Sequence, residues 1–265
     1  MEHTFLISYV VKVMKQFLIW SDFATYRGDG FSSNRHSHFY IQISLPDSGR
    51  VELKTRGSDW KTYNAVFIPS GVSHEMRKVD GDLTLFYLDP LTIGYNLFYD
   101  RSLAMGHSAF EVGDLFTDSI KQQIKQILYT SNKKVRTELL EIFNIDVEKH
   151  IPRQMDLRIQ KSITNINLED FSLPNLAAEA SLSVERFRHL FKEETGVPFS
   201  AYRLWLKTKK AVEYIASRNP LLDAAHEGGF ADQSHFTRIF RRSFGISPSD
   251  FTKKKEPFTT IFFTK

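Results

Sequence analysis

Hydrophobic and polar positions follow two different periods along this chain of 265 residues. Between residues 17 and 90, apolar residues form short runs or alternate with polar ones, and clusters of Gly, Pro, Asp and Ser separate these segments. Alternation with a period of two is typical of strands with one buried face. Several short strands at even spacing favour a β-sandwich or barrel. We expect strands over residues 39–45, 50–56, 65–69 and 83–88.

From about residue 113 the apolar spacing becomes helical. Apolar positions at 115–128 and 139–143 predict two amphipathic helices, which can either cover the barrel or pair with a second copy of the chain. Ile151-Pro152 marks a boundary, because the residue before proline disfavours helix. The later part predicts helices over 173–180, 184–194, 201–216, 221–227 and 233–244. The predicted fold is α+β and multidomain: a β-barrel or sandwich with following helices, then an all-α region.

Composition removes several classes of protein. The chain has no Cys, which excludes disulfide scaffolds, Cys-ligated zinc, iron–sulfur clusters and Cys nucleophiles. The apolar run near the start, 5–13, contains a lysine, is too short for a membrane span and lacks the features of a secretory signal. We therefore expect a soluble, cytoplasmic protein without a membrane partner.

The charge is unevenly distributed between the two parts of the chain. Residues 151–265 hold 18 Lys+Arg against 13 Asp+Glu, whereas the first 150 hold 17 against 18. All of the excess positive charge thus lies in the helical part, which suggests a polyanion as its partner. A basic surface that only contacts solvent would have the same net charge. The spacing of residues therefore has to distinguish such a surface from a site that binds a polyanion.

An internal repeat runs through the helical part. Residues pair at an offset of 49: Phe187 with Phe236, Phe191 with Phe240, Gly196 with Gly245, and Tyr202 with Phe251. Upstream, Leu176-Ala177 matches Ala224-Ala225 at an offset of 48, so the second copy has one extra residue in its turn. Each copy consists of a short helix, a tight turn and a second helix, which is the helix-turn-helix plan.

The second helix of each copy has a polar outward face. At about 100° per residue, Phe187, Leu190 and Phe191 share one face of the first such helix. Its opposite face carries Glu185, Arg188, His189 and Lys192, and that of the second carries Ser234, Thr237, Arg238 and Arg241. Any surface helix has charges opposite its core, but the recurrence after matching turns favours contacts with DNA bases or phosphates.

Residues 153–252 resemble the DNA-binding domain of AraC-type transcription regulators. The resemblance covers Leu173–Ser183, Phe187–Gly196 and 20 consecutive positions, Gly229–Pro248. It implies two helix-turn-helix units joined by a long helix, about 202–217, with both second helices in successive major grooves of double-stranded DNA. The sequence departs from the family at Ala224, at Pro198-Phe199 and in its apolar end, residues 253–265.

The resemblance also implies residue roles. The base-reading residues would be Glu185, Arg188, His189, Gln233, Ser234, His235 and Arg238. Lys192, Arg241 and Arg242 would hold phosphates, and Lys207, Lys209 and Lys210 either do the same or are plain solvated charge. Further partners expected of such a regulator are RNA polymerase and a second copy of the chain.

The strand-rich part contains three histidines in a recognisable frame. Gly30, His36, His38, Gln42 and Gly49 follow the spacing of the first cupin motif, and Pro69–His74 follows the second. This part resembles the cupin-type effector domain that AraC-type regulators often carry, with Gln42 where metal-binding cupins usually have Glu. We expect a small-molecule pocket without cofactor or metal, lined by His36, His38, Tyr40, Gln42, Phe67, His74 and Phe86, with Phe39 as a further aromatic candidate. A divalent metal held by the three histidines is the alternative.

Together these features predict a sequence-specific DNA-binding transcription regulator, not an enzyme, controlled by a small molecule in the barrel. The expected domains are the effector domain 1–112, a helical dimerisation or linker segment 113–152, the tandem helix-turn-helix domain 153–252 and the tail 253–265. Two alternatives stay open: a metal-dependent cupin oxygenase or isomerase, and a regulator that responds to no ligand and uses its first domain for dimerisation.

Overall fold

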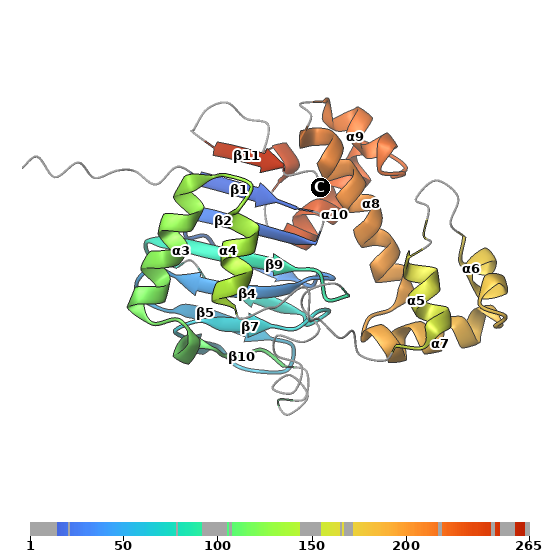
Figure 1. Cartoon of the computed structure of the whole chain (residues 1–265), viewed down its shortest axis with the longest axis horizontal. Coiled ribbons are helices and arrows are strands. Elements are labelled where there is room, and N and C mark those ends of the chain that lie inside the picture. Colours follow the sequence, from blue (N-terminus) through green and yellow to red (C-terminus); the bar gives the residue numbers. More distant parts are fainter. Residues whose placement is uncertain are drawn as a thin grey trace, which may run out of the picture.

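The structure is a computed structural model of the whole chain (Figure 1). It describes residues 15–20, 22–77, 79–91, 105, 108–143, 155–164, 166, 172–216, 219–244, 247–249 and 258–262. The boundary expected at Ile151-Pro152 and the repeat partners Gly245 and Phe251 lie outside the described residues. No helix within the described ranges has the length and the apolar composition that a membrane crossing needs.

The first part of the chain is built from two β-sheets. Its strands are β1 Lys15–Ile19, β2 Phe23–Asp29, β3 Ser33–His36, β4 Ile41–Pro46, β5 Val51–Thr55, β6 Lys61–Tyr63, β7 Val66–Ile68, β8 His74–Met76, β9 Asp82–Leu88 and β10 Phe110–Glu111. The larger sheet has the order β10-β7-β4-β9-β2-β1-β11, in which β11 is Phe258–Phe262, and the smaller one has the order β3-β8-β5-β6. Each of the four predicted strands is confirmed, as β4, β5, β7 and β9.

Alternation along β4 assigns its side chains to two different environments. Ile41, Ile43 and Leu45 join an apolar cluster with the helices α3 Asp118–Thr130 and α4 Val135–Ile142, which cover the outer face of the larger sheet (Figure 1). Gln42 and Ser44 are also buried, and they hydrogen-bond to each other at 2.9 Å. The larger sheet is therefore buried on both faces.

The amphipathic helices pack their apolar stripe against the barrel. Ile124, Leu128, Leu139 and Leu140 pack in the cluster beneath the two helices, so this stripe is not free to pair with a second copy. Leu115 departs from the prediction, because it lies in the short 3₁₀ turn Gly113–Leu115 and is 40% exposed.

The helices of the second part agree closely with the predicted ranges. They are α5 Leu157–Thr164, α6 Leu173–Glu179, α7 Val184–Thr195, α8 Phe199–Ala216, α9 Leu221–Glu227 and α10 Gln233–Phe244. The joining helix α8 begins directly after Pro198 and has 18 residues, which makes it about 27 Å long. In Figure 1 it runs from the α5–α7 group to the α9–α10 pair.

The two helix-turn-helix units share one turn geometry. Ser181 and Gly229, at an offset of 48, both adopt a left-handed backbone conformation, with φ of 55° and 69°. In each turn the next backbone N–H bonds to the carbonyl five residues back, at 2.8 and 2.9 Å, which closes the preceding helix. Four residues separate α6 from α7 and five separate α9 from α10, which confirms the extra residue predicted for the second turn.

The C-terminal part is not all-α as predicted. Residues Phe258–Phe262 form strand β11, which pairs in parallel with β1 at the edge of the larger sheet, Thr260 opposite Phe17 (Figure 1). The end of the chain thereby returns from the helix-turn-helix units to the first sheet. The prediction missed this strand, whose partner β1 lies more than 200 residues earlier in the sequence.

Aromatic side chains join the barrel to the helical part. The ring of Tyr40 lies 4.2 Å from that of Trp205 on α8, and Phe39 lies 5.2 Å from Tyr202 on the same helix. Phe244 of α10 approaches the Tyr40 ring at 5.7 Å. Both ends of the tandem unit are therefore in contact with the barrel through α8 and α10.

Candidate nucleic-acid interface and histidine centre

Helix α7 presents the polar face that its spacing predicts. The Ser183 hydroxyl accepts a hydrogen bond from the Arg186 backbone N–H at 3.2 Å and caps the helix N-terminus. Its apolar residues turn inward, with Phe187 and Phe191 fully buried. The predicted outward residues are all exposed: Glu185, Arg188, His189 and Lys192.

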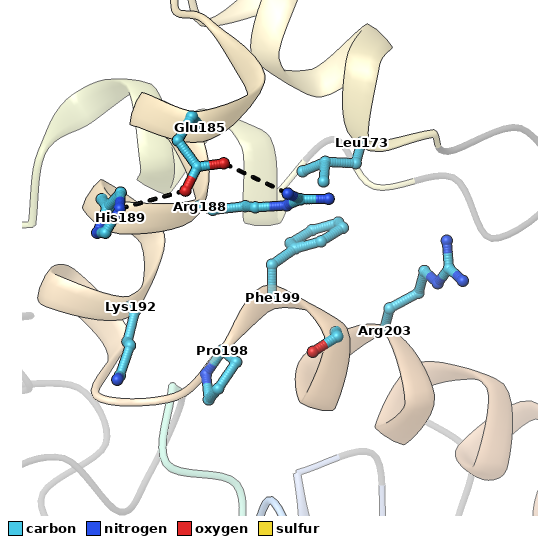
Figure 2. Close-up of a pocket in the computed structure, with 9 residues that line it drawn as sticks. Leu173, Glu185, Arg188, His189, Lys192, Pro198, Phe199 and Arg203 are labelled. Carbon is cyan, nitrogen blue, oxygen red and sulfur yellow. Dashed lines mark hydrogen bonds and ion pairs between the residues drawn. The ribbon is translucent and has the colours of Figure 1, made fainter.

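These four side chains line one hollow of about 440 Å³ (Figure 2). Its other wall comes from Leu173, from Pro198 and from the start of α8, with Phe199, Ser200 and Arg203. Within it the Glu185 carboxylate pairs with Arg188 at 3.4 Å and with His189 at 3.3 Å. All three side chains are more than half exposed, so these pairs contribute little to stability and can exchange for contacts with a ligand. Sequence reasoning did not single out Arg203, whose cation adds to this surface.

Helix α10 repeats the arrangement with different chemistry. The Asp232 carboxylate accepts from the His235 backbone N–H at 2.7 Å, at the position that corresponds to Ser183 in the first unit. The inward residues Phe236, Ile239, Phe240 and Phe244 are buried, and the predicted contact residues Gln233, Ser234, Arg238, Arg241 and Arg242 are exposed. The His235 side chain is only half-buried, with its ring 5.5 Å from that of Phe230, so it is the least available of the predicted readers.

Two of the lysines on α8 have contacts within the protein. Lys207 donates from Nζ to the Gly229 carbonyl at 2.6 Å, which ties α8 to the second turn. Lys210 pairs with Glu227 of α9 at 2.9 Å. A Cβ at Gly228 would meet the Lys207 carbonyl at 2.7 Å and the Ala211 methyl at 2.8 Å, so this close approach to α8 requires glycine.

The three histidines of the barrel come together in its interior. His36 ends β3, His74 begins β8 directly opposite it, and His38 follows β3. The ring centroids lie 4.2 to 5.5 Å apart, and one ring nitrogen from each residue lies within 4.8 Å of the others. The residues are 9%, 6% and 1% exposed, for His36, His38 and His74.

Burial keeps these imidazoles neutral. It lowers the pKa of His36, lowers the pKa of His38 to about 3 with a further contribution from the neighbouring His36, and lowers the pKa of His74 well below its ordinary value. In each ring Nδ1 faces a backbone carbonyl, that of Asn34, Tyr40 or Val72, at 2.8 to 2.9 Å. The prediction that the three rings converge is confirmed by this geometry.

The pocket residues predicted from the sequence divide between two faces of the sheet. Tyr40 and Gln42 lie with the histidines, and His38 Nε2 is 2.9 Å from Gln42 Oε1. Phe67 and Phe86 are wrong predictions: they pack on the helix-covered face, against Phe110 at 4.8 Å and Phe143 at 5.1 Å. Both phenylalanines lie in strands that are buried on both faces. Their neighbours in the strand point to the opposite face, so apolar character did not reveal which face of the sheet each phenylalanine joins. Tyr87, next to Phe86, faces His38 instead, and its ring lies 6.0 Å from that of His38, as the ring of Tyr40 also does.

Comparisons with known proteins find a helix-turn-helix domain and relatives that are transcription regulators. A family model described as a helix-turn-helix domain matches residues 176–254. The probable transcriptional regulator LumQ of Photobacterium leiognathi is 32% identical over 235 residues, which cover 82% of this chain and 91% of that protein. The virulence regulon transcriptional activator VirF of Yersinia enterocolitica is 28% identical over 105 residues, and the match spans only 38% of its length.

Among solved structures the fold is similar to that of ToxT from Vibrio cholerae. One such structure has a TM-score of 0.53 at 14% identity and covers 87% of this chain and 96% of that one. A second, with ToxT bound to (E)-4-(8-methylnaphthalen-1-yl)but-3-enoic acid, has a TM-score of 0.50 at 13% identity, with 87% and 98% covered. At these identities the likeness extends to the fold alone.

Proposed function

The chain belongs to the AraC-type family of transcription regulators, and on that premise we propose that it binds specific DNA sequences through α7 and α10 under the control of its barrel. The observation that carries the proposal is the exposure of both outward faces, with only Thr237 half-buried among their predicted residues, each on a capped helix that follows the same turn. A helix N-terminus with exposed polar side chains is the part of a helix-turn-helix unit that enters the major groove.

The proposed readers differ between the two helices. Arg188 and Arg238 suit guanine, Gln233 suits adenine, and Glu185 can accept from cytosine. His189 and Ser234 complete the set, with His235 as its least exposed member. Lys192, Arg203, Arg241 and Arg242 would hold phosphates.

Equivalent positions of the two proposed reading helices, α7 and α10, carry different side chains. At the offset of 49, Glu185 corresponds to Ser234, Arg188 to Thr237, and His189 to Arg238. Two helices that offer different donors and acceptors do not read the same bases. We therefore expect one chain to recognise two unlike half-sites on one side of the DNA, about one helical turn apart.

The barrel is proposed as the control module. A small molecule held near Tyr40, Gln42 and the histidines would lie next to the α8 contact, and one ToxT structure of the same fold holds an organic acid. Such a ligand acts only through different affinities for two arrangements of the domains. RNA polymerase and a second copy of the chain remain proposed partners, and we propose no catalytic activity.

The test is selection of DNA by the full chain. Genomic fragments are bound at physiological salt, and the enriched sequences are then measured in competition against unrelated DNA. The proposal expects at least about 10³-fold tighter binding to the selected sites. Equal, weak affinity for all sequences would contradict it, because charge alone gives such binding.

A further inference from the structure

The positions of the protons define the histidine centre. A backbone carbonyl only accepts hydrogen bonds, so the carbonyls of Asn34, Tyr40 and Val72 require that Nδ1 of each facing ring carries the proton. A neutral imidazole has one proton, which leaves Nε2 as a lone pair in all three rings. Anchoring of Nδ1 by a carbonyl is also the arrangement that orients histidines which ligate metals.

These lone pairs are poorly satisfied by the protein. Nε2 of His74 is fully buried and has no hydrogen-bond partner among the described residues. Nε2 of His38 faces Gln42 Oε1, which is also an acceptor, at 2.9 Å. The Gln42 amide can donate to the His38 ring only by turning its NH₂ group toward Nε2 of His38. The amide would then lose its hydrogen bond to the Ser44 hydroxyl.

We propose that His36, His38 and His74 bind a divalent first-row transition-metal ion, and that this ion is an effector that acts on the DNA-binding helices through Tyr40. Three converging imidazole nitrogens select such ions over Mg²⁺ or Ca²⁺, which prefer oxygen ligands. Three protein ligands leave a position open for a further ligand, water or the Gln42 oxygen.

The route from the centre to the helices is short. His38 is anchored on the carbonyl of Tyr40, whose ring contacts Trp205 of α8 at 4.2 Å and Phe244 of α10 at 5.7 Å. The ring nitrogens lie up to 4.8 Å apart, whereas tetrahedral bonds of about 2.0–2.1 Å place them about 3.3 Å apart. Binding would therefore draw the rings together and shift the segment between His38 and Tyr40. This second half of the proposal rests on the proposed function.

The binding half is tested on the untagged full chain after treatment with a chelator. We expect one Co²⁺ per chain by visible absorption, displaced by Zn²⁺, and a melting temperature that rises with Zn²⁺ but not with Mg²⁺. His36→Gln should weaken binding at least about 100-fold. His226→Gln, an exposed histidine on α9, is the matched control and should bind as wild type does.

Failure of the binding half has a definite form. Wild type that takes up no more Co²⁺ than His36→Gln, and whose melting temperature does not change with Zn²⁺, overturns the metal site. The melting experiment uses wild type alone, so the conclusion holds even where His36→Gln folds poorly.

The effector half is read from DNA affinity with and without one equivalent of Zn²⁺. We expect at least about a tenfold change for wild type and His226→Gln, and none for His36→Gln. Wild type that binds the ion and selects DNA, but with unchanged affinity, overturns the effector half. Wild type that binds the ion yet selects no DNA sequence contradicts the proposed function and leaves the metal site intact.

Discussion

The two arginines proposed to read guanine differ in the contacts that they make within the protein. Arg188 is paired with Glu185 at 3.4 Å, and the same carboxylate also pairs with His189. Arg238 lies on α10 at the position that corresponds to His189 and is exposed. The first reader must therefore exchange an internal contact for one with DNA, at little cost because exposed ion pairs are weak.

Arg238→Ala should cost about 1–3 kcal/mol of discrimination at one base pair, because a bidentate arginine–guanine contact is lost. The measurement is competition between the selected site and single-base variants of it. Arg241→Ala is the matched control: loss of a phosphate contact weakens binding to all sequences alike and lowers the salt slope by about 1. An unchanged base preference in Arg238→Ala would show that this residue does not read a base.

Asp89 is a titratable group at the contact between barrel and α8. Its carboxylate accepts from the Leu91 backbone N–H at 2.8 Å, and the residue is 8% exposed. Burial raises its pKa to about 6, against the opposing effect of Lys209 on α8 and with a contribution from Asp22. The same carboxylate contributes to the raised pKa of Tyr202 on α8. Protonation therefore favours the folded contact.

The sign of the resulting pH dependence follows from the raised pKa. The stabilisation is fully present below the unfolded pKa near 4 and is lost as pH rises through about 6. It amounts to at most about 3 kcal/mol. Between pH 5 and pH 7.5 the melting temperature of Asp89→Asn should therefore fall less, or rise more, than that of wild type. Parallel profiles for the two proteins would exclude Asp89 as the cause.

At the scale of elements, β11 links the two parts of the molecule. It pairs with β1 at the edge of the larger sheet and also approaches α8. An edge strand leaves unpaired backbone groups, and β11 covers those of β1. We propose that this strand limits the movement of the helix-turn-helix units relative to the barrel.

Removal of residues 258–265 should expose the edge of β1. We expect faster amide hydrogen exchange in residues 15–19, because the parallel ladder with β11 is lost. Exchange in β4 and β9, which lie in the middle of the sheet, should not change. A shorter truncation, of 263–265, serves as control. Unaltered exchange at β1 after the longer deletion would contradict the pairing.

The helices could be predicted from the sequence. Long-range strand pairing, and the face of the sheet to which a side chain points, could not. The limits of α7 and α10 are set locally, by the capping residues Ser183 and Asp232 and by core phenylalanines at helical spacing, so they could be predicted closely. Strand β11 consists of aromatic and β-branched residues, which favour a strand, but its local sequence does not identify β1 as the partner. Phe67 and Phe86 were assigned to the wrong face because their strands are apolar on both sides.

The histidine centre shows the same limit of sequence-based prediction. The cupin-like spacing of His36, His38 and His74 placed all three in one predicted pocket. The hydrogen bonds from their Nδ1 atoms to three carbonyls depend on the path of the backbone and could not be predicted. That Tyr40 links this centre to Trp205 is likewise a property of the packing.

At the scale of the whole molecule, the apolar core is not divided along the domain boundary. One cluster contains residues of both sheets together with the second helix-turn-helix unit, and another joins Phe39 of the barrel to the first unit. The long helix α8 contacts the barrel between these two regions (Figure 1). A change in the barrel can therefore alter how α7 and α10, the helices proposed to read DNA, are held.

The central claim is that α7 and α10 each read one half of a single DNA site. Hydroxyl-radical footprinting of the selected site with wild type, Arg188→Ala and Arg238→Ala tests it most directly. Two protected patches about 10 base pairs apart are expected for wild type. Each variant should weaken protection of a different patch. One patch for wild type, or the same patch weakened by both variants, would contradict the claim.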